Sequence, residues 1–308
     1  MEASEDKSNH PGIVVPQETL QKNVKKDGTF SGCTNGDREY DNGGDSYADP
    51  FEGMKIDSHD VLHKVVGRTK CPGCHASRKW FCYSCFRLVS ELEGKVPSVK
   101  LPVKVDIIKH PRELEGKSTA VHAAVIANDD VKVHIYPCIP EFEEDLEKVL
   151  LVFPSSSAIP LEEYAKKHRR NEDSHDEDGP RLKRPKHDGK YGTTVNRVIF
   201  IDSTWNQTSS IYRDDRLQGL QCVVLKSVKT SFWRKQEKKP DTYLATIEAI
   251  YHFLVEYHQL FIDSEYDGRY DNLLYFYSFL HKIVQQNMKE RILQGTFKPR
   301  VKTPKTKR

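Results

Sequence analysis

The stretch 198–205, which reads Val-Ile-Phe-Ile-Asp-Ser-Thr-Trp, constrains the fold more than any other part of the chain. Four apolar residues run directly into Asp202, Ser203, Thr204 and Trp205. Such a run is typical of a strand buried on both faces of a parallel sheet, and ligands of open α/β sheets bind where these strands end. The stretch therefore predicts a central strand that delivers a carboxylate, two hydroxyls and an indole to a binding site. The alternative is an ordinary strand before a capped helix, with Asp202 or Ser203 as the cap and Trp205 in the core.

Strand-like and helix-like segments alternate along much of the remaining chain. Apolar patterns predict strands over 103–110, 131–136, 149–153 and 220–225, and helical spacing predicts helices over 120–127, 161–168, 206–214, 242–259 and 273–284. Alternation of this kind is typical of units in which a helix connects two parallel strands. The sequence thus predicts an α/β fold with a mostly parallel sheet.

Two Cys-x-x-Cys units separated by seven residues indicate a metal site. They comprise Cys71 with Cys74 and Cys82 with Cys85. Four thiolates suit tetrahedral zinc, and because four protein ligands leave no open position, we expect the zinc to be structural. A redox role for one pair is the alternative, although it leaves the second pair unexplained. His75 is a conceivable competing ligand, and the aromatic residues nearby can either contact RNA or pack this region against the main domain.

Composition divides the chain into four regions. Residues 1–55 are acidic, polar and poor in apolar periodicity, so we expect them to be disordered. Residues 56–100 form the cysteine-containing region, 101–288 the main domain and 289–308 a basic tail, and the charged stretch 169–191 is expected to be a disordered insertion. Residues 1–60 hold 13 acidic and 6 basic side chains, whereas 289–308 hold 8 basic and 1 acidic. This asymmetry indicates a nucleic-acid partner, or only a solubilising tail.

Further patterns bear on the location of the protein and on its partners. The chain has no run of about 18 apolar residues and no signal peptide at its N-terminus, so we expect a soluble intracellular monomer without a membrane partner. A reducing compartment favours metal ligation over disulfides for the seven cysteines. A basic patch resembles a nuclear localisation signal and consists of Arg181, Lys183, Arg184 and Lys186. We therefore expect the protein in the nucleus, with the cytoplasm as a second location.

The segment 226–239 combines positive charge with aromatic side chains. It holds six basic residues and one acidic residue around Phe232 and Trp233. Cations that meet phosphates and rings that stack on exposed bases suit an RNA contact. A solvated loop with one packed tryptophan is the alternative.

Several motifs resemble those of the DTW-domain family. Asp-Ser-Thr-Trp at 202–205 is similar to the Asp-x-Thr-Trp signature that names the family, and His-Pro-Arg-Glu at 110–113 to its His-Pro-x-Glu element. Ala-Thr-Ile-Glu-Ala at 245–249 is similar to its Ser-Thr-Leu-Glu-Ala box, and the paired Cys-x-x-Cys units precede all three in the family's order. Ala245 stands where the family usually has Ser, which argues against an essential hydroxyl there. The resemblance covers roughly residues 65–285.

This resemblance implies a fold and a reaction. The implied fold is a SPOUT-like, deeply knotted sheet whose loops bind the co-substrate S-adenosylmethionine. The implied reaction transfers its 3-amino-3-carboxypropyl group to N3 of a uridine in tRNA, in the D-loop, and yields acp3U and methylthioadenosine. A SPOUT-like RNA methyltransferase and a non-catalytic zinc-containing RNA-binding protein are the alternatives.

The resemblance also suggests roles for individual residues. Asp202 is the candidate general base, or orients the uracil imide, and Trp205 stacks on a base or walls the co-substrate pocket. Glu248 is a third catalytic candidate, with a supporting role behind the site as the alternative. We expect hydrogen bonds or ion pairs to co-substrate, uracil or phosphate from Ser203, Thr204, Thr246, Arg234, His110 and Glu113, with Arg112 as an alternative to Arg234. These roles require His110, Asp202, Trp205 and Glu248 to meet at one cleft.

Overall fold

The computed structural model describes residues 49–142, 146–173, 195–234 and 240–296. Its main sheet has six strands in the order β6-β5-β9-β7-β10-β8, and every neighbouring pair is parallel. The strands are β5 (Lys104–Lys109), β6 (Val131–Ile135), β7 (Val149–Val152), β8 (Ile159–Pro160), β9 (Arg197–Asp202) and β10 (Gln221–Val224). The predicted α/β fold with a mostly parallel sheet is confirmed. Most of the stretches expected to be disordered, 1–55 and 169–191, and most of the basic tail lie outside the described residues.

The strand that was predicted to be central, β9, lies between β5 and β7. Phe200 stands opposite Ile107 of β5 and Val152 of β7, and Asp202 stands opposite Lys109. Successive side chains of a strand point to opposite faces, and Val198 and Phe200 join one core while Ile199 and Ile201 join the other. This register places Asp202 at the carboxyl edge of the sheet, beside the end of β5.

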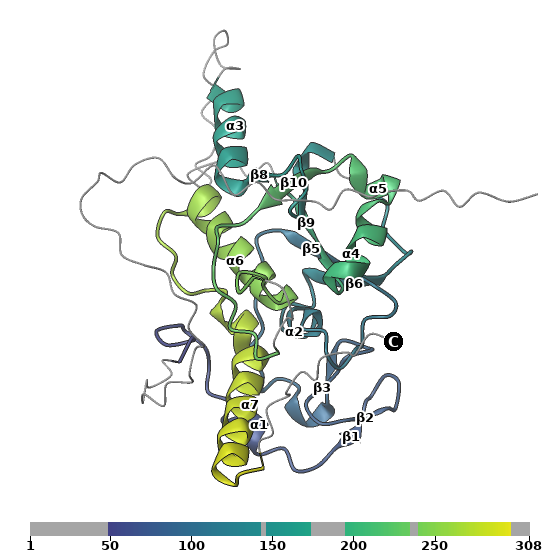
Figure 1. The fold of residues 1–308 in the computed structure, drawn as a ribbon, viewed down its shortest axis with the longest axis vertical. Helices are drawn as coiled ribbons and strands as arrows, with labels where there is room; N and C mark the ends of the chain where they lie inside the picture. The colour runs from purple at the N-terminus through teal and green to yellow at the C-terminus, as the bar shows by residue number, and fades with distance from the viewer. Residues whose placement is uncertain (1–48, 143–145, 174–194, 235–239, 297–308) are drawn as a thin grey trace, which may run out of the picture. The chain divides into compact units, whose positions relative to one another are not determined.

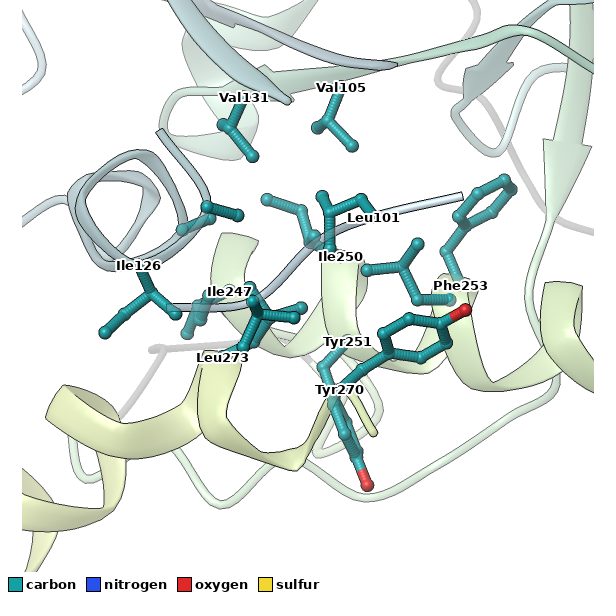
Figure 2. Packing of buried hydrophobic residues seen from close by; sticks show 14 of the residues in the cluster. Leu101, Val105, Ile126, Val131, Ile247, Ile250, Tyr251, Phe253, Tyr270 and Leu273 are labelled. Atoms are coloured by element: carbon teal, nitrogen blue, oxygen red, sulfur yellow. The ribbon is translucent and has the colours of Figure 1, made fainter. Parts of the chain in front are cut away.

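Helices cover both faces of the sheet (Figure 1). One face is covered by α2 (Ala120–Ile126), α3 (Leu161–Asp173), α6 (Thr246–Tyr257), η4 (Asp271–Leu274) and α7 (Tyr275–Leu293), and the other by α4 (Trp205–Tyr212) and α5 (Asp215–Gln218). Figure 2 shows the larger core, in which Val105 and Val131 from the strands face Ile247 and Ile250 of α6. Burial of these apolar side chains is the main force that holds the layers together.

Several element bounds differ from the sequence expectation. The helix expected over 273–284 begins as α7 at Tyr275 and continues to Leu293. The helix expected from 242 begins at Thr246, because the Glu248 carboxylate accepts the Ala245 N–H (2.8 Å) and fixes the first turn there. The helix expected to end at 168 continues to Asp173, so the first five residues of the expected insertion are helical. The strand β8 has only two residues, too few to produce a recognisable pattern.

The cysteines lie in a small region of short strands, which we call the cysteine module and define as residues 61–90, and this region packs against the larger core. It contains two antiparallel pairs, β1 (Thr69–Lys70) with β2 (Ser77–Arg78) and β3 (Phe81–Cys82) with β4 (Arg87–Leu88). Trp80 donates from Nε1 to the Leu62 carbonyl oxygen (3.1 Å) and meets Phe279 of α7 edge-on at 5.1 Å. Phe81 packs against Phe276 at 4.7 Å. The sequence left open whether the aromatic residues of this region contact RNA or pack against the main domain. In the structure, Trp80 and Phe81 pack against the main domain.

Short helices complete the described chain. They are α1 (Asp60–His63), η1 (Ser90–Leu92), η2 (Leu146–Lys148) and the π-helix η3 (His258–Ile262), which extends α6. Among the described helices, none combines the length and the apolar character that a membrane crossing requires.

Candidate active site

Asp202 joins the central strand to the starts of two helices. Its Oδ2 accepts a hydrogen bond from Ser118 Oγ (2.7 Å), and its Oδ1 accepts one from Thr246 Oγ1 (2.6 Å). Ser118 lies just before α2, and Thr246 is the first residue of α6. The two helices are also linked directly, because the Ile247 N–H donates to Thr119 Oγ1 (3.2 Å). Asp202 therefore fixes both helix starts at the carboxyl edge of the sheet.

The surroundings of Asp202 change its acidity. The side chain is buried, with 4% of its surface exposed. Burial raises the pKa of Asp202 above the ordinary carboxyl value, while the hydrogen bonds from Ser118 and Thr246 and the positive charge of Lys109 act in the lowering direction without cancelling it. A carboxylate with a raised pKa is a better proton acceptor near neutral pH than an ordinary one.

One cation, Lys109, and a second carboxylate, Glu113, lie close to Asp202, and a second cation, Arg234, lies close to Glu113. Lys109, only 5% exposed, donates from Nζ to the Glu113 carbonyl oxygen (2.9 Å), and Arg234 donates from Nη1 to the Lys117 carbonyl oxygen (2.8 Å). Burial and then the negative charge of Asp202 raise the pKa of Glu113, while Lys109, Lys117 and Arg234 oppose the rise. Burial lowers the pKa of Arg234, and Glu113 opposes that change. Asp202, Glu113, Lys109 and Arg234 thus form one charge cluster, which we call the rim cluster.

His110, Ser203 and Thr204 lie at this edge and bond within the chain. The His110 N–H donates to the Asp202 carbonyl oxygen (2.9 Å), and His110 Nδ1 accepts the Arg112 N–H (3.1 Å). The Ser203 hydroxyl bonds that of Thr208 (2.8 Å). Thr204 is the N-cap of α4, where its N–H (3.3 Å) and its hydroxyl (2.8 Å) both donate to Gln207 Oε1. The helix cap is therefore Thr204, and not Asp202 or Ser203. Trp205 begins α4, and its side chain lies outside what the structure describes.

Glu248 lies one layer behind the rim cluster. Its carboxylate accepts hydrogen bonds from Thr230 Oγ1 (2.6 Å), the Ser231 N–H (2.7 Å) and the Ala245 N–H (2.8 Å). Residues two apart on a helix point to different sides, so Glu248 cannot share the direction of Thr246. Glu248 holds the segment that leads to Arg234, and these contacts favour the supporting role over the catalytic one.

We expect Glu248→Ala to destabilise the fold. The change leaves three donors without their buried acceptor, and the expected loss in the free energy of unfolding is about 3 kcal/mol. Chemical denaturation measures this loss, and Glu290→Ala on the exposed end of α7 is the matched control, for which we expect little change. Equal stability of the two variants would show that the Glu248 contacts contribute nothing.

The four predicted cysteine ligands do come together. Their Sγ atoms all lie within 4.8 Å of one another, and Cys74 and Cys82 approach to 3.6 Å, close to the ~3.8 Å that tetrahedral zinc sets between sulfurs. The two units have the same local geometry, because the residue after each second cysteine has a left-handed backbone, with φ 59° at His75 and 55° at Phe86. The cluster can hold a zinc ion with four thiolates, and His75 is not one of the residues in it.

A cavity with a volume of about 650 Å³ lies between the cysteine module and the outer strand β6. Its lining includes Phe86, Leu88, Val125 and Val133 but no member of the rim cluster. We therefore base the candidate site on the grouping of side chains and not on this cavity.

Around Asp202 the structure places Thr246, Glu113 and the backbone of His110, with Arg234 beside Glu113. Glu248 bonds elsewhere and the side chain of Trp205 is not described, so the meeting of His110, Asp202, Trp205 and Glu248 at one cleft stays a prediction.

Two residues that the sequence did not single out, Lys109 and Ser118, join the group. Lys109 is the last residue of an alternating strand, where a lysine normally indicates a solvent-facing position. Ser118 lies just before α2, where its hydroxyl accepts the Ala120 N–H (3.2 Å) and also donates to Asp202. In the sequence, the one indication that Ser118 belongs to the site is that it follows closely after the His-Pro-Arg-Glu motif.

Comparison with known proteins identifies the family of the chain. The family model described as the DTW domain matches residues 79–285. The chain is 46% identical over 256 residues to a tRNA-uridine aminocarboxypropyltransferase 1 of Homo sapiens, which covers 77% of this chain and 84% of the relative. Proteins of the same name from Xenopus tropicalis (44% over 257 residues, 78% and 87%) and Rattus norvegicus (41% over 292 residues, 89% and 93%) are also similar. No solved structure matches the chain.

Proposed function

The chain belongs to the DTW-domain family, and we propose that it is a tRNA-uridine aminocarboxypropyltransferase. In this proposal it transfers the 3-amino-3-carboxypropyl group of S-adenosylmethionine to N3 of a uridine in tRNA, which yields acp3U and methylthioadenosine. The observation that carries the proposal is the rim cluster, in which two cations and two carboxylates lie around the end of the central strand.

The charges of this cluster match the group that is transferred. The 3-amino-3-carboxypropyl group carries one ammonium and one carboxylate, so a site for it needs a cation and an anion a few ångströms apart. We assign the carboxylate to Lys109 and Arg234 and the ammonium to Glu113, because charge-assisted hydrogen bonds are the stronger kind. A methyltransferase binds the same ammonium and carboxylate as part of its co-substrate, so these charges support a site for S-adenosylmethionine, and the position of a label distinguishes the two transfers.

The reaction balances with the residues of this edge. A bond forms between N3 of the uridine and the γ-carbon of the donor, while the bond between that carbon and the sulfonium sulfur breaks. The electron pair stays on sulfur, which leaves as the thioether of methylthioadenosine, and the N3 proton passes to a base, for which we propose Asp202. The uridine must be unpaired for N3 to be reached, as in a loop of the tRNA. Aiming the γ-carbon and not the methyl at N3 is a matter of positioning.

Other parts of the proposal have separate support. Four clustered thiolates support a structural zinc ion. Family membership and the parallel sheet support a SPOUT-like knotted topology, with Ser203, Thr204 and Trp205 around the co-substrate or the base. The basic patch that predicts the nucleus lies outside the described residues, and the nucleus as location and the monomer stay predictions.

The direct test uses purified protein, unmodified tRNA and S-adenosylmethionine labelled in the aminocarboxypropyl group. We expect label in the tRNA and acp3U among its nucleosides by mass spectrometry. Transfer of a label placed in the methyl group would instead identify a methyltransferase. Absence of both labels, with RNA binding retained, would identify a non-catalytic binder.

The assignment of Lys109 gives a binding prediction that needs no turnover. S-adenosylhomocysteine contains the aminocarboxypropyl group and methylthioadenosine lacks it, so their affinity ratio reports recognition of that group. We expect Lys109→Met to lower the ratio by about 30-fold, since truncating a buried charged partner costs about 2 kcal/mol or more. Isothermal titration measures both affinities, and Lys117→Met, an exposed lysine of the same loop, is the control. An unchanged affinity ratio in Lys109→Met would show that Lys109 does not bind the aminocarboxypropyl group.

A further inference from the structure

We propose that the cysteine module binds backbone phosphates of the RNA substrate, outside the nucleotide that reacts. The identity of this RNA as tRNA rests on the proposed function, whereas the binding surface rests on the module itself. In this proposal the module binds and orients the RNA, and the rim cluster carries out the reaction.

The first observation is charge. Residues 61–90 contain six Lys or Arg side chains and no Asp or Glu. Four thiolates around one divalent zinc ion leave two negative charges, so the module keeps a net charge of +4 with neutral histidines. Asp60 and Glu91 flank the module and Glu115 contacts it, but within the module the charge other than that of the thiolates is positive throughout, which is the electrostatic signature of a phosphate-binding surface.

The second observation is that the cations are accessible. Lys64, Arg68, Lys70 and Arg87 are exposed. Arg68 also donates to Ser77 Oγ (3.1 Å) and so helps to hold the module together. Lys64, Lys70 and Arg87 are exposed on the surface of the module. Extended cationic side chains of this kind neutralise phosphates in a largely sequence-independent way.

The third observation separates phosphate binding from base stacking. Trp80 and Phe81 are occupied by Phe279 and Phe276 of the main domain. The guanidinium of Arg78 lies 3.8 Å from the centre of the Tyr83 ring and covers it. With these rings engaged inside the protein, the module offers cations and not aromatic platforms, so its RNA contact is with the backbone.

The fourth observation connects the module to the candidate site. Ser84 of the module donates to Glu115 Oε2 (2.7 Å), and Glu115 belongs to the loop that carries Glu113 and Ser118. This loop, 110–119, has two arginine or lysine residues and two glutamates, so it adds little net attraction of its own. An RNA that reaches this loop therefore draws its attraction from the adjacent module.

The experiment compares two double variants that each remove two positive charges. One is Lys70→Gln with Arg87→Gln in the module. The control is Lys166→Gln with Lys167→Gln on α3, which are exposed and lie at the opposite end of the protein from β1 and β2 in Figure 1. Fluorescence anisotropy of labelled, unmodified tRNA is measured from about 50 to 200 mM salt, a range in which phosphate contacts weaken strongly.

We expect the module variant to bind tRNA on the order of tenfold more weakly at low salt. The slope of log K against log salt should fall by about 1.5, because each lost phosphate contact removes roughly 0.7 to 0.9. Zinc content, melting temperature and affinity for S-adenosylhomocysteine should stay at wild-type values, and the α3 variant should match the wild type throughout.

Two outcomes would overturn the inference. If the module variant bound tRNA with wild-type affinity and wild-type salt dependence, Lys70 and Arg87 would not contact the RNA and would serve only to keep the module soluble. A changed preference among tRNA sequences at constant slope would mean base recognition in place of phosphate contact. The inference is separable from the proposed function, because weakened RNA binding in the module variant would stand even if the wild-type protein formed no acp3U.

Discussion

Replacing Asp202 with Asn is expected to lower kcat/KM for aminocarboxypropyl transfer by about 10²- to 10⁴-fold, the usual contribution of a general base. Asn keeps the size of the side chain and one carbonyl acceptor for the Ser118 and Thr246 hydroxyls, but it cannot take the N3 proton. The label-transfer reaction under single-turnover conditions measures the loss. Asp241→Asn is the control, since it removes the same charge from an exposed position in the segment before α6. Activity of Asp202→Asn within a fewfold of this control would exclude the general-base role.

The pH dependence provides a second readout for the same residue. Because the pKa of Asp202 is raised, the acid limb of kcat/KM in the wild type should lie above the ordinary carboxyl range, and Asp202→Asn should lack that limb. The sign for stability is the opposite of that for activity. A raised folded-state pKa contributes stability below the unfolded value and loses it as pH rises through the folded value. The free energy of unfolding of Asp202→Asn should therefore rise relative to that of the wild type as the pH increases, because only the wild type loses this stabilisation.

Loss of the zinc site is expected to have the largest effect on stability. Structural zinc contributes an apparent ~10–16 kcal/mol to the folding of small zinc peptides. The strands of the cysteine module have two residues each and cannot hold its shape without the metal. We expect Cys82→Ser, which removes a buried ligand, to abolish zinc binding and to lower the melting temperature by more than about 10 °C.

The zinc prediction is measured by metal analysis and thermal unfolding. The wild type should contain one zinc per chain and should be destabilised by a strong chelator. Cys138→Ser is the matched control, because Cys138 is an exposed cysteine outside the cluster. Retention of zinc and of the wild-type melting temperature in Cys82→Ser would contradict a four-thiolate site. Unfolding of the module should also disturb the loop 110–119 beside the candidate site, because Ser84 of the module donates a hydrogen bond to Glu115 of that loop.

Several features could be read from the sequence because short segments encode them. The apolar run before Asp202 specified a buried strand, and the strand β9 ends at that residue. The spacing of four cysteines specified a tetrahedral set of ligands, and their sulfurs do converge. The charge at the ends of the chain and the motifs shared with the DTW-domain family are equally local.

The composition of the rim cluster was decided by the tertiary structure. Ser118 and Thr246 reach Asp202 across 84 and 44 residues, and Lys109 stands beside it only because β5 and β9 are neighbours in the sheet. The periodicity of a segment sets which side chains face inward, but it does not specify which strand will lie next to it. The direction of Glu248 has the same origin, since the fold turns it towards Ser231 while Thr246 faces Asp202, which favours a supporting role for Glu248. The sequence by itself thus determined most of the elements and the cysteine cluster, and only the packing of the sheet, by bringing distant segments together, determined which charges surround Asp202.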